Sequence, residues 1–178
     1  MALNFVKGTA YSLLQSDFRG NLATSGTIVP GAIVRLDPTT QNILLGSSVT
    51  TELVATADLL GIALNSDLDG DCLESGKLAA SAFDGNSVIQ TDQVSGTIST
   101  SNYPVGTFLT ANSSGQFTTA TVGTHKLLGV VEGVGTIPGV ATTITSAGYT
   151  NTNGVVVAGV ATGVQAPITV LTIKLLAA

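Results

Sequence analysis

The sequence predicts a mainly β fold, a compact sandwich-like or barrel-like arrangement of short antiparallel strands and hairpins with at most one or two short helices. Three observations lead to this fold class. Threonine far outnumbers lysine and arginine combined, and threonine, valine and isoleucine are enriched in strands. Several segments alternate apolar and polar residues, which is the period of a half-buried strand. Glycine-containing turn sequences separate these segments.

The expected strands follow one another along the chain. Residues 32–36 alternate and lead into an Asp-Pro-Thr-Thr turn, and residues 168–175 alternate as a final strand. Residues 107–120 form the clearest hairpin, because Asn-Ser-Ser-Gly lies between two strand-like runs and its glycine can take a left-handed conformation. Asp84-Gly85 and Asn153-Gly154 are two further hairpin signals.

The evidence for helices is limited to two short segments. Residues 51–60 place Leu53, Ala57 and Leu60 at positions i, i+4 and i+7, which permits a short helix. Residues 10–18 are equally ambiguous between helix and strand.

The chain also contains a weak internal repeat. Residues 30–63 and residues 104–131 each predict a hairpin followed by a strand that opens Leu-Leu-Gly. Two related lobes within one fold follow from this pattern. We therefore expect an N-terminal arm or entry segment at 1–20 and a single β-rich domain at 21–178, with sub-lobes at 21–92 and 93–178 and a long loop at 66–75.

The composition excludes several classes of protein. Only 10% of the 178 residues are charged, against about 25% in an ordinary domain, so the chain is not of the disordered class. A net charge of −5 offers no basic stripe for nucleic acid. The most apolar stretch, residues 154–161, is too short to span a bilayer, and the N-terminus lacks the pattern of a signal peptide. We expect neither nucleic acid nor membrane as a partner.

The residues that could carry chemistry form no catalytic set. His125 is the only histidine, and no Gly-x-Ser-x-Gly nucleophile motif accompanies it, so it is predicted to be a residue at the end of a hairpin. Cys72 is the only cysteine and has no partner for a Cys-x-x-Cys motif, which indicates a structural thiol. The sequence predicts that the protein is not an enzyme and needs no cofactor.

One acidic cluster leaves a metal site open as an alternative. The carboxylates of Asp67, Asp69 and Asp71 stand at alternate positions, as at the start of a calcium loop. Gly70 stands at position four instead of six, and Leu78 replaces the glutamate of position twelve. A solvated turn is therefore favoured over a calcium site.

The shortage of charge is concentrated at the end of the chain. From residue 133 to 178 the only charged side chain is Lys174. Obligate protein interfaces are more apolar than the remaining protein surface, so we expect this segment to lie against other subunits. The candidate oligomer interface residues are Val155, Val156, Val157 and Val160.

A series of motifs between residues 31 and 88 carries a family resemblance. It comprises a strand ending in Leu-Asp (32–37), a Pro-Thr-Thr-Gln turn (38–41), a second strand (42–45) and Leu-Gly-Ile-Ala-Leu-Asn (60–65), with Ser-Gly-Lys-Leu (75–78) following. This pattern resembles the head-decoration, or capsid-cement, proteins of tailed bacteriophages. Residues 105–132 are similar to the same theme in related virion proteins.

The resemblance implies a non-enzymatic homotrimer on the outer surface of a phage capsid, made in the host cytoplasm. Such a protein clamps neighbouring major capsid subunits, and members of the family often carry an N-terminal arm that extends a capsid sheet by strand addition. The matching segment here is Ala2, Leu3, Asn4, Phe5 and Val6. The alternative for this segment is an N-terminal strand of its own domain.

Other functions stay open beside capsid binding. A tail, fibre-base or other shell component belongs to the same broad class. A carbohydrate-binding or host-surface-binding β module would need exposed aromatic side chains, and the chain has no tryptophan and three tyrosines.

Overall fold

The structure is a computed structural model of the chain. The residues that it describes are 3–7, 17–22, 28–37, 39–46, 59–66, 76–139, 141–145, 149–150, 156–157, 160–164 and 166–177. The chain divides into two compact units, of which unit 1 holds residues 1–135 and 170–178, and unit 2 holds residues 136–169. The expected arm at 1–20 and the sub-lobes at 21–92 and 93–178 stay predictions.

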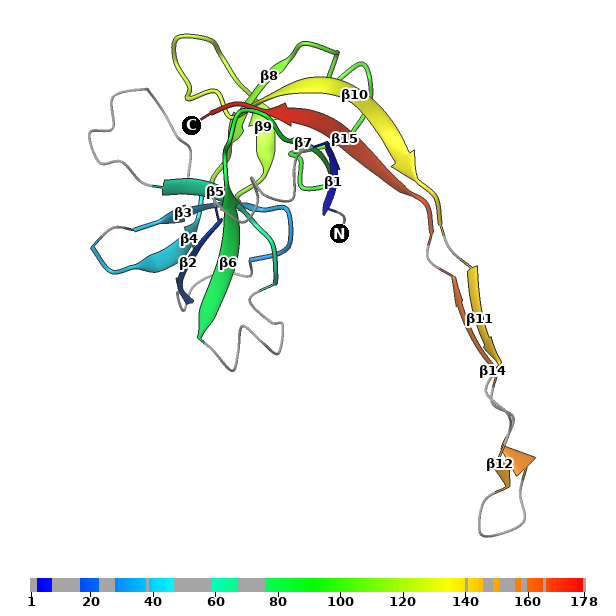
Figure 1. Cartoon of the computed structure of the whole chain (residues 1–178). Helices are drawn as coiled ribbons and strands as arrows, with labels where there is room; N and C mark the ends of the chain where they lie inside the picture. Colours follow the sequence, from blue (N-terminus) through cyan, green and yellow to red (C-terminus); the bar gives the residue numbers. More distant parts are fainter. Residues whose placement is uncertain are drawn as a thin grey trace. The chain divides into compact units, whose positions relative to one another are not determined.

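One part of unit 1, formed by five strands between residues 17 and 82, is a closed barrel (Figure 1). Its strands, in the order in which they pair, are β2 (Asp17–Leu22), β4 (Asn42–Leu45), β3 (Ile33–Leu36), β5 (Leu59–Ala63) and β6 (Lys77–Ala82). Only β2 and β4 run parallel, and the other neighbours are antiparallel. The inward positions carry small and branched apolar side chains that form one buried cluster: Ile28, Ala32, Val34, Ile43, Ala63, Leu78 and Ala80.

A six-stranded sheet forms the remainder of unit 1. Its order is β1 (Leu3–Lys7), β7 (Val88–Thr91), β15 (Ile168–Leu175), β10 (Gly129–Ile137), β8 (Phe108–Ala111) and β9 (Phe117–Thr119). One buried cluster joins the sheet to the barrel, because Ile33 and Ile62 of the barrel belong to it together with Leu109 and Phe117 of the sheet. Barrel and sheet therefore share a core.

Unit 2 is built from two-stranded ladders, and we call residues 136–169 the ribbon. Strands β11 (Ala141–Thr145) and β14 (Val160–Val164) pair antiparallel, with residue 141 opposite 164 and residue 145 opposite 160. Strands β12 (Tyr149–Thr150) and β13 (Val156–Val157) pair antiparallel as well. Among the described residues, no third strand joins either ladder.

The mainly β prediction is confirmed, and the described residues contain no helix. The hairpin at 107–120 is present as β8 and β9, with Gly115 at a φ of +70°, and the final strand is present as β15. The strands on either side of Asn153-Gly154 pair as predicted, although the turn itself lies outside the described residues. Of the candidate helix at 10–18, only residues 17–18 are described, and they lie in β2. Of the candidate helix at 51–60, only residues 59–60 are described, and they lie in β5.

The prediction of a hairpin at Asp84-Gly85 is wrong. The turn exists, since the Asp84 carboxylate accepts hydrogen bonds from the amides of Asn86 and Ser87 at 2.9 Å each and Gly85 has a φ of +76°. However, β6 before it pairs within the barrel and β7 after it pairs within the six-stranded sheet. The turn residues specify a local reversal, whereas burial in two different parts of the core decides which strands pair.

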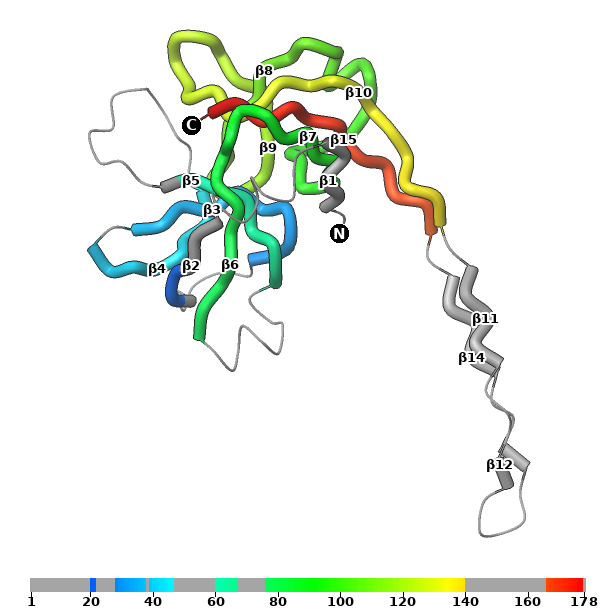
Figure 2. Tube along the Cα trace, in the orientation of Figure 1, coloured from blue at the N-terminus to red at the C-terminus, as the bar shows by residue number. Residues whose placement is uncertain are grey.

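The internal repeat is confirmed, and its two copies pair in the same order. Repeat 1 (residues 30–63) has the order β4-β3-β5, and repeat 2 (residues 104–131) has the order β9-β8-β10. The registers correspond as well, because Val34 lies opposite Gly61 and Leu109 lies opposite Gly129. In Figure 2 the described parts of repeat 1 are blue to green-cyan, and repeat 2 is green to yellow.

Candidate interaction surface

Each repeat begins with the same glycine turn. In repeat 1 the amide of Ala32 donates to the carbonyl of Val29 at 3.0 Å, and in repeat 2 Thr107 donates to Pro104 at 3.1 Å. The third residue of each turn is a glycine with a φ of +87°, a value that favours glycine. This correspondence places Phe108 of repeat 2 at the position of Ile33 in repeat 1.

Each hairpin also ends in a matching tip held by a side-chain acceptor. The Asp37 carboxylate accepts the amide of Thr39 at 2.8 Å, and the side-chain oxygen Oδ1 of Asn112 accepts the amide of Ser114 at 2.9 Å. The hydrogen bond from the Thr39 amide, followed by that from the Thr40 hydroxyl, lowers the pKa of Asp37. Both tips are therefore ordered by local hydrogen bonds.

The tip of repeat 2 covers the outer side of repeat 1. The amide of Ile33 donates to the carbonyl of Gly115 at 2.7 Å, and the carbonyl of Ile33 accepts the amide of Gly46 at 2.8 Å. A Cβ atom at Gly115 would lie 2.8 Å from the Ile33 carbonyl oxygen, so the two backbones are in close contact. Ile33 is fully buried, and it belongs to the cluster that joins the barrel to the six-stranded sheet.

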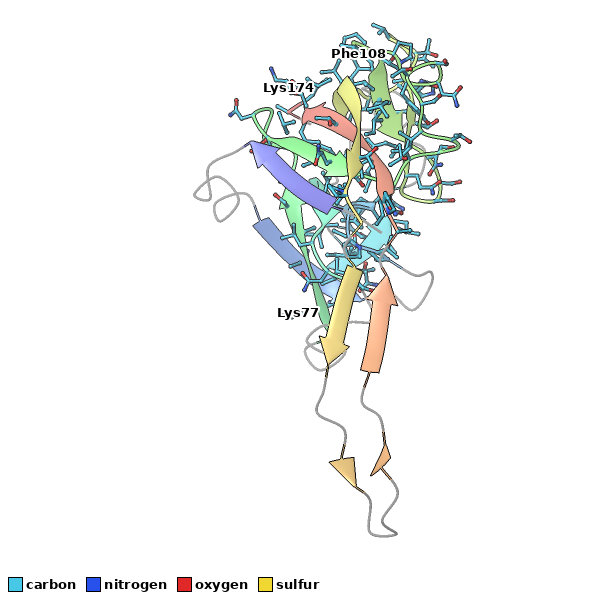
Figure 3. The ribbon with its side chains drawn as sticks, turned by 90° about the vertical axis from the view of Figure 1, so that its right-hand side faces the viewer. Lys77, Phe108 and Lys174 are labelled. Atoms are coloured by element: carbon cyan, nitrogen blue, oxygen red, sulfur yellow. The ribbon has the colours of Figure 1, made fainter. Side chains whose placement is uncertain are left out.

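Large hydrophobic side chains are exposed at one end of repeat 2, and we call them the repeat 2 patch. Among the described residues the exposed large hydrophobic side chains are Val105, Phe108 and Val122, with exposed fractions of 74%, 38% and 64%. The amide of Ala120 donates to the carbonyl of Phe108 at 2.8 Å, so Val105 before β8 and Val122 after β9 leave the same end of the hairpin. In Figure 3 Phe108 lies at the end of unit 1 farthest from Lys77.

Hydrogen bonds hold both loops that carry the patch. On one side the hydroxyl of Tyr103 donates to the carbonyl of Ser95, and burial raises the pKa of Tyr103, so this donor stays protonated. On the other side Nδ1 of His125 accepts the amide of Thr121 at 2.9 Å, which agrees with the prediction that His125 is a structural residue at a hairpin end. The patch is thus presented on fixed loops.

The structure places the predicted arm within the chain's own sheet. Leu3–Lys7 forms β1, which pairs antiparallel with β7 at the edge of the six-stranded sheet, and Ala2 lies outside the described residues. The described structure thus has the alternative arrangement, a strand of its own domain. Capsid contact by Leu3, Asn4, Phe5 and Val6 stays a prediction.

The other predicted site residues divide between described and undescribed segments. Val156 and Val157 form β13 and Val160 begins β14, so three of the four interface candidates belong to the ribbon strands. The undescribed candidates are Val155, Cys72 and the acidic residues Asp67, Asp69 and Asp71.

The described part of the chain shows no cluster suited to metal chemistry. Within it, no three His, Cys, Asp or Glu side chains lie close enough to hold an ion. The same residues include no helix with the length and apolar character needed to cross a membrane.

Sequence reasoning did not identify the repeat 2 patch. Two signals in the sequence point to it. Residues 93–124 contain no charged side chain, and alignment of the two repeats puts Phe108 where repeat 1 has a core isoleucine. Neither signal shows exposure, because exposure depends on which element covers the position.

Comparison with known proteins adds no relative to this description. No protein-family model, no curated protein and no solved structure matches the chain.

Proposed function

We propose that this chain is a structural virion protein that binds the outer surface of a phage capsid. It stabilises the shell by clamping neighbouring major capsid subunits, and it assembles with itself, as a homotrimer. The proposal includes no enzymatic activity and no cofactor.

The ribbon is the observation that carries this proposal. Its 34 residues, 136–169, contain no charged side chain, and the strands that lie wholly within it, β11 to β14, pair only two by two. A two-stranded ribbon is marginally stable in water, because it has no second layer against which to bury side chains. Contact with another protein chain would supply that buried surface.

The edges of the ribbon support the same conclusion. Proteins usually protect exposed strand edges with charged residues, especially lysine, or with proline. The ribbon has prolines only at its ends, Pro138 and Pro167, and no charge between them. Its strands are therefore suited to pairing with, or packing on, a neighbouring subunit.

Shell stabilisation follows from mass action. A protein that binds only the assembled, expanded shell stabilises that state by an amount that rises with the logarithm of its concentration relative to the dissociation constant. Unit 1 has its own buried clusters and can act as the folded body from which the ribbon strands are supplied. The resemblance of residues 31–88 to head-decoration proteins supports this assignment.

The test is co-sedimentation of the purified full-length chain with expanded and with immature heads of the phage that encodes it. Retention on expanded heads only is expected. Val160→Lys should weaken retention roughly tenfold or more, because a charge buried in an interface without a partner costs several kcal/mol. Thr100→Lys is the matched control, since it adds the same charge to an exposed loop of unit 1.

Three outcomes would contradict the proposal. They are failure to bind either kind of head, equal binding to both, and localisation of the chain to the tail in an electron cryomicroscopy map of the particle. Thermal unfolding of both variants checks that unit 1 remains folded. Equal loss of retention in Val160→Lys and Thr100→Lys would remove the ribbon from the contact.

A further inference from the structure

We infer that Lys7 and Lys174 form a basic pair on the six-stranded sheet that receives acidic side chains of a partner protein. The inference deepens the proposed function, on which it rests for the identity of that partner, the major capsid subunit. It concerns the sheet of unit 1, whereas the ribbon carries the capsid contact in the proposed function. A probe that contains no capsid can therefore test the pair separately.

Strand register puts the two lysines in one row across β7. Val88 lies opposite Lys7 of β1 on one side and opposite Lys174 of β15 on the other. Residues that lie opposite each other in antiparallel strands belong to the same face of the sheet. Neighbouring strands are about 4.8 Å apart, so the Cα atoms of the two lysines are separated by roughly 10 Å. Two lysines at this separation can contact one carboxyl group or two neighbouring ones.

A bulge in β1 is what places Lys7 on this face. Phe5 lies opposite Ile89, which belongs to the buried cluster between sheet and barrel. Regular alternation would put Lys7 on the same face as Phe5, towards that cluster. The register shifts by one residue between Phe5 and Lys7, so Lys7 lies opposite Val88 instead. Bulges are a device by which strands re-aim a side chain, and this one brings the second lysine into the row of Lys174.

Lys174 offers its charge at the surface. Its side chain is exposed, whereas its neighbours in β15, Ile173 and Leu175, are buried (Figure 3). Among the described residues, none forms an ion pair with Lys174. It is also the only charged residue after Glu132. The charge is therefore available to a partner.

Charge complementarity selects an acidic partner. The chain has six basic residues against eleven acidic ones, and two of the six stand in this row. Two positive charges on one face repel each other, and a carboxylate placed between them replaces that repulsion with attraction. A phosphate polymer carries a charge on every unit, so the net charge of −5 would repel it. An acidic protein segment can present only the one or two carboxylates that the pair needs.

A row of uncharged polar residues adjoins the pair on the same face. Gln90, two residues beyond Val88 in β7, lies opposite both Asn4 and Thr172. Gln90 and Thr172 are half-buried. Amide and hydroxyl groups donate and accept hydrogen bonds, so they suit the backbone and polar side chains of a protein. Charged and polar groups together are typical of the rim of a protein interface.

The first measurement uses fluorescent poly-L-glutamate as the probe and the purified full-length chain without capsids. The wild type should bind, and rising salt should weaken binding because it screens exposed charges. The double variant Lys7→Gln with Lys174→Gln keeps the length of both side chains and should bind roughly tenfold more weakly, since two exposed ion pairs are lost. Lys7→Arg with Lys174→Arg should bind as the wild type does. Lys126→Gln is the control, because it removes the same charge from a residue outside β1 and β15.

The second measurement is co-sedimentation with expanded heads over a range of salt concentrations. The double glutamine variant should be retained less than the wild type and should depend less on salt, whereas Lys126→Gln should match the wild type. Thermal unfolding checks that both variants remain folded, as expected for an exposed position such as Lys174.

The outcomes separate this inference from the proposed function. If the double glutamine variant matches the wild type in both assays, the inference is wrong although capsid binding stands. Tighter binding of polyphosphate than of poly-L-glutamate would likewise overturn the assignment to an acidic protein. If the wild type binds no heads but binds poly-L-glutamate through the two lysines, the proposed function fails and the carboxylate site is supported.

Discussion

Replacing Gly115 with alanine tests the contact between the two repeats. Gly115 has a φ of +70°, and a Cβ atom there would lie 2.8 Å from both the Ile33 carbonyl oxygen and Leu45 Cδ2. Contacts below 3 Å force atoms to move, and here one of the atoms belongs to the backbone of β3. The substitution therefore strains the backbone and also pushes the tip of repeat 2 off repeat 1.

The two costs can be separated with a matched glycine. Alanine in the left-handed region costs about 1–2 kcal/mol, and overpacking a close contact costs about 1–3 kcal/mol more. Gly115→Ala should therefore lower the free energy of unfolding by roughly 2–5 kcal/mol. Gly96 has a φ of +83° and open space around its Cβ position, so Gly96→Ala should show only the backbone cost. The entropy that alanine removes from the unfolded chain is the same in both variants.

Urea unfolding followed by far-ultraviolet circular dichroism measures the difference in the free energy of unfolding between the two variants. Both are measured at the same protein concentration, and the slopes of their transitions are compared. Gly115→Ala should be the less stable variant by about 1–3 kcal/mol at unchanged slope. Equal stability of the two variants would refute a close contact between the Gly115 tip and Ile33.

Three further predictions follow from contacts in unit 1. Gly129→Ala should lower the free energy of unfolding by about 1–3 kcal/mol, because its Cβ atom would lie 2.6 Å from Ile173 Cγ2; urea unfolding measures this, and an unchanged midpoint would contradict it. Thr110→Val should raise the free energy of unfolding by about 1 kcal/mol, since the Thr110 hydroxyl is buried without a hydrogen-bond partner among the described residues. The same urea unfolding measures this, and a lower free energy of unfolding in the variant would show that the hydroxyl has a hydrogen-bond partner. Burial raises the pKa of Asp84, but hydrogen bonds led by those of Ser87 outweigh burial and leave the pKa below the ordinary 3.8. The Asp84 carboxyl therefore binds a proton more readily in the unfolded chain than in the folded one. The free energy of unfolding that this carboxylate contributes is present above pH 3.8 and is lost as the pH falls through the lower pKa of the folded state, so Asp84→Asn should make the urea midpoint depend less on pH in that range. Identical pH profiles of the variant and the wild type would contradict this.

Local patterns predicted the elements whose formation depends on nearby residues. The hairpin at 107–120 was predictable because the Asn112 side chain and the left-handed Gly115 specify the turn, and the strands on both sides alternate. The repeat was visible because the Leu-Leu-Gly sequence marks the third strand of each copy, where Gly61 and Gly129 occupy matching register positions.

Pairing between distant strands was not predictable in the same way. The Asp84-Gly85 turn has all the features of a hairpin, yet β6 and β7 join different sheets. Likewise, Leu3–Lys7 pairs with β7, a strand more than eighty residues away in the sequence. Such choices depend on which apolar faces can be buried together, and short sequence windows do not contain that information.

The sequence by itself determined the fold class, most of the turns, the repeat and the shortage of charge after residue 132, because propensity, alternation and composition act over a few neighbouring residues. Only the tertiary structure decided that Ile33 is buried and Phe108 is exposed, although the two occupy matching positions in the repeat. The physical reason is that burial belongs to the contact between elements. The tip of repeat 2 packs on repeat 1, and the described chain has no third repeat to pack on repeat 2.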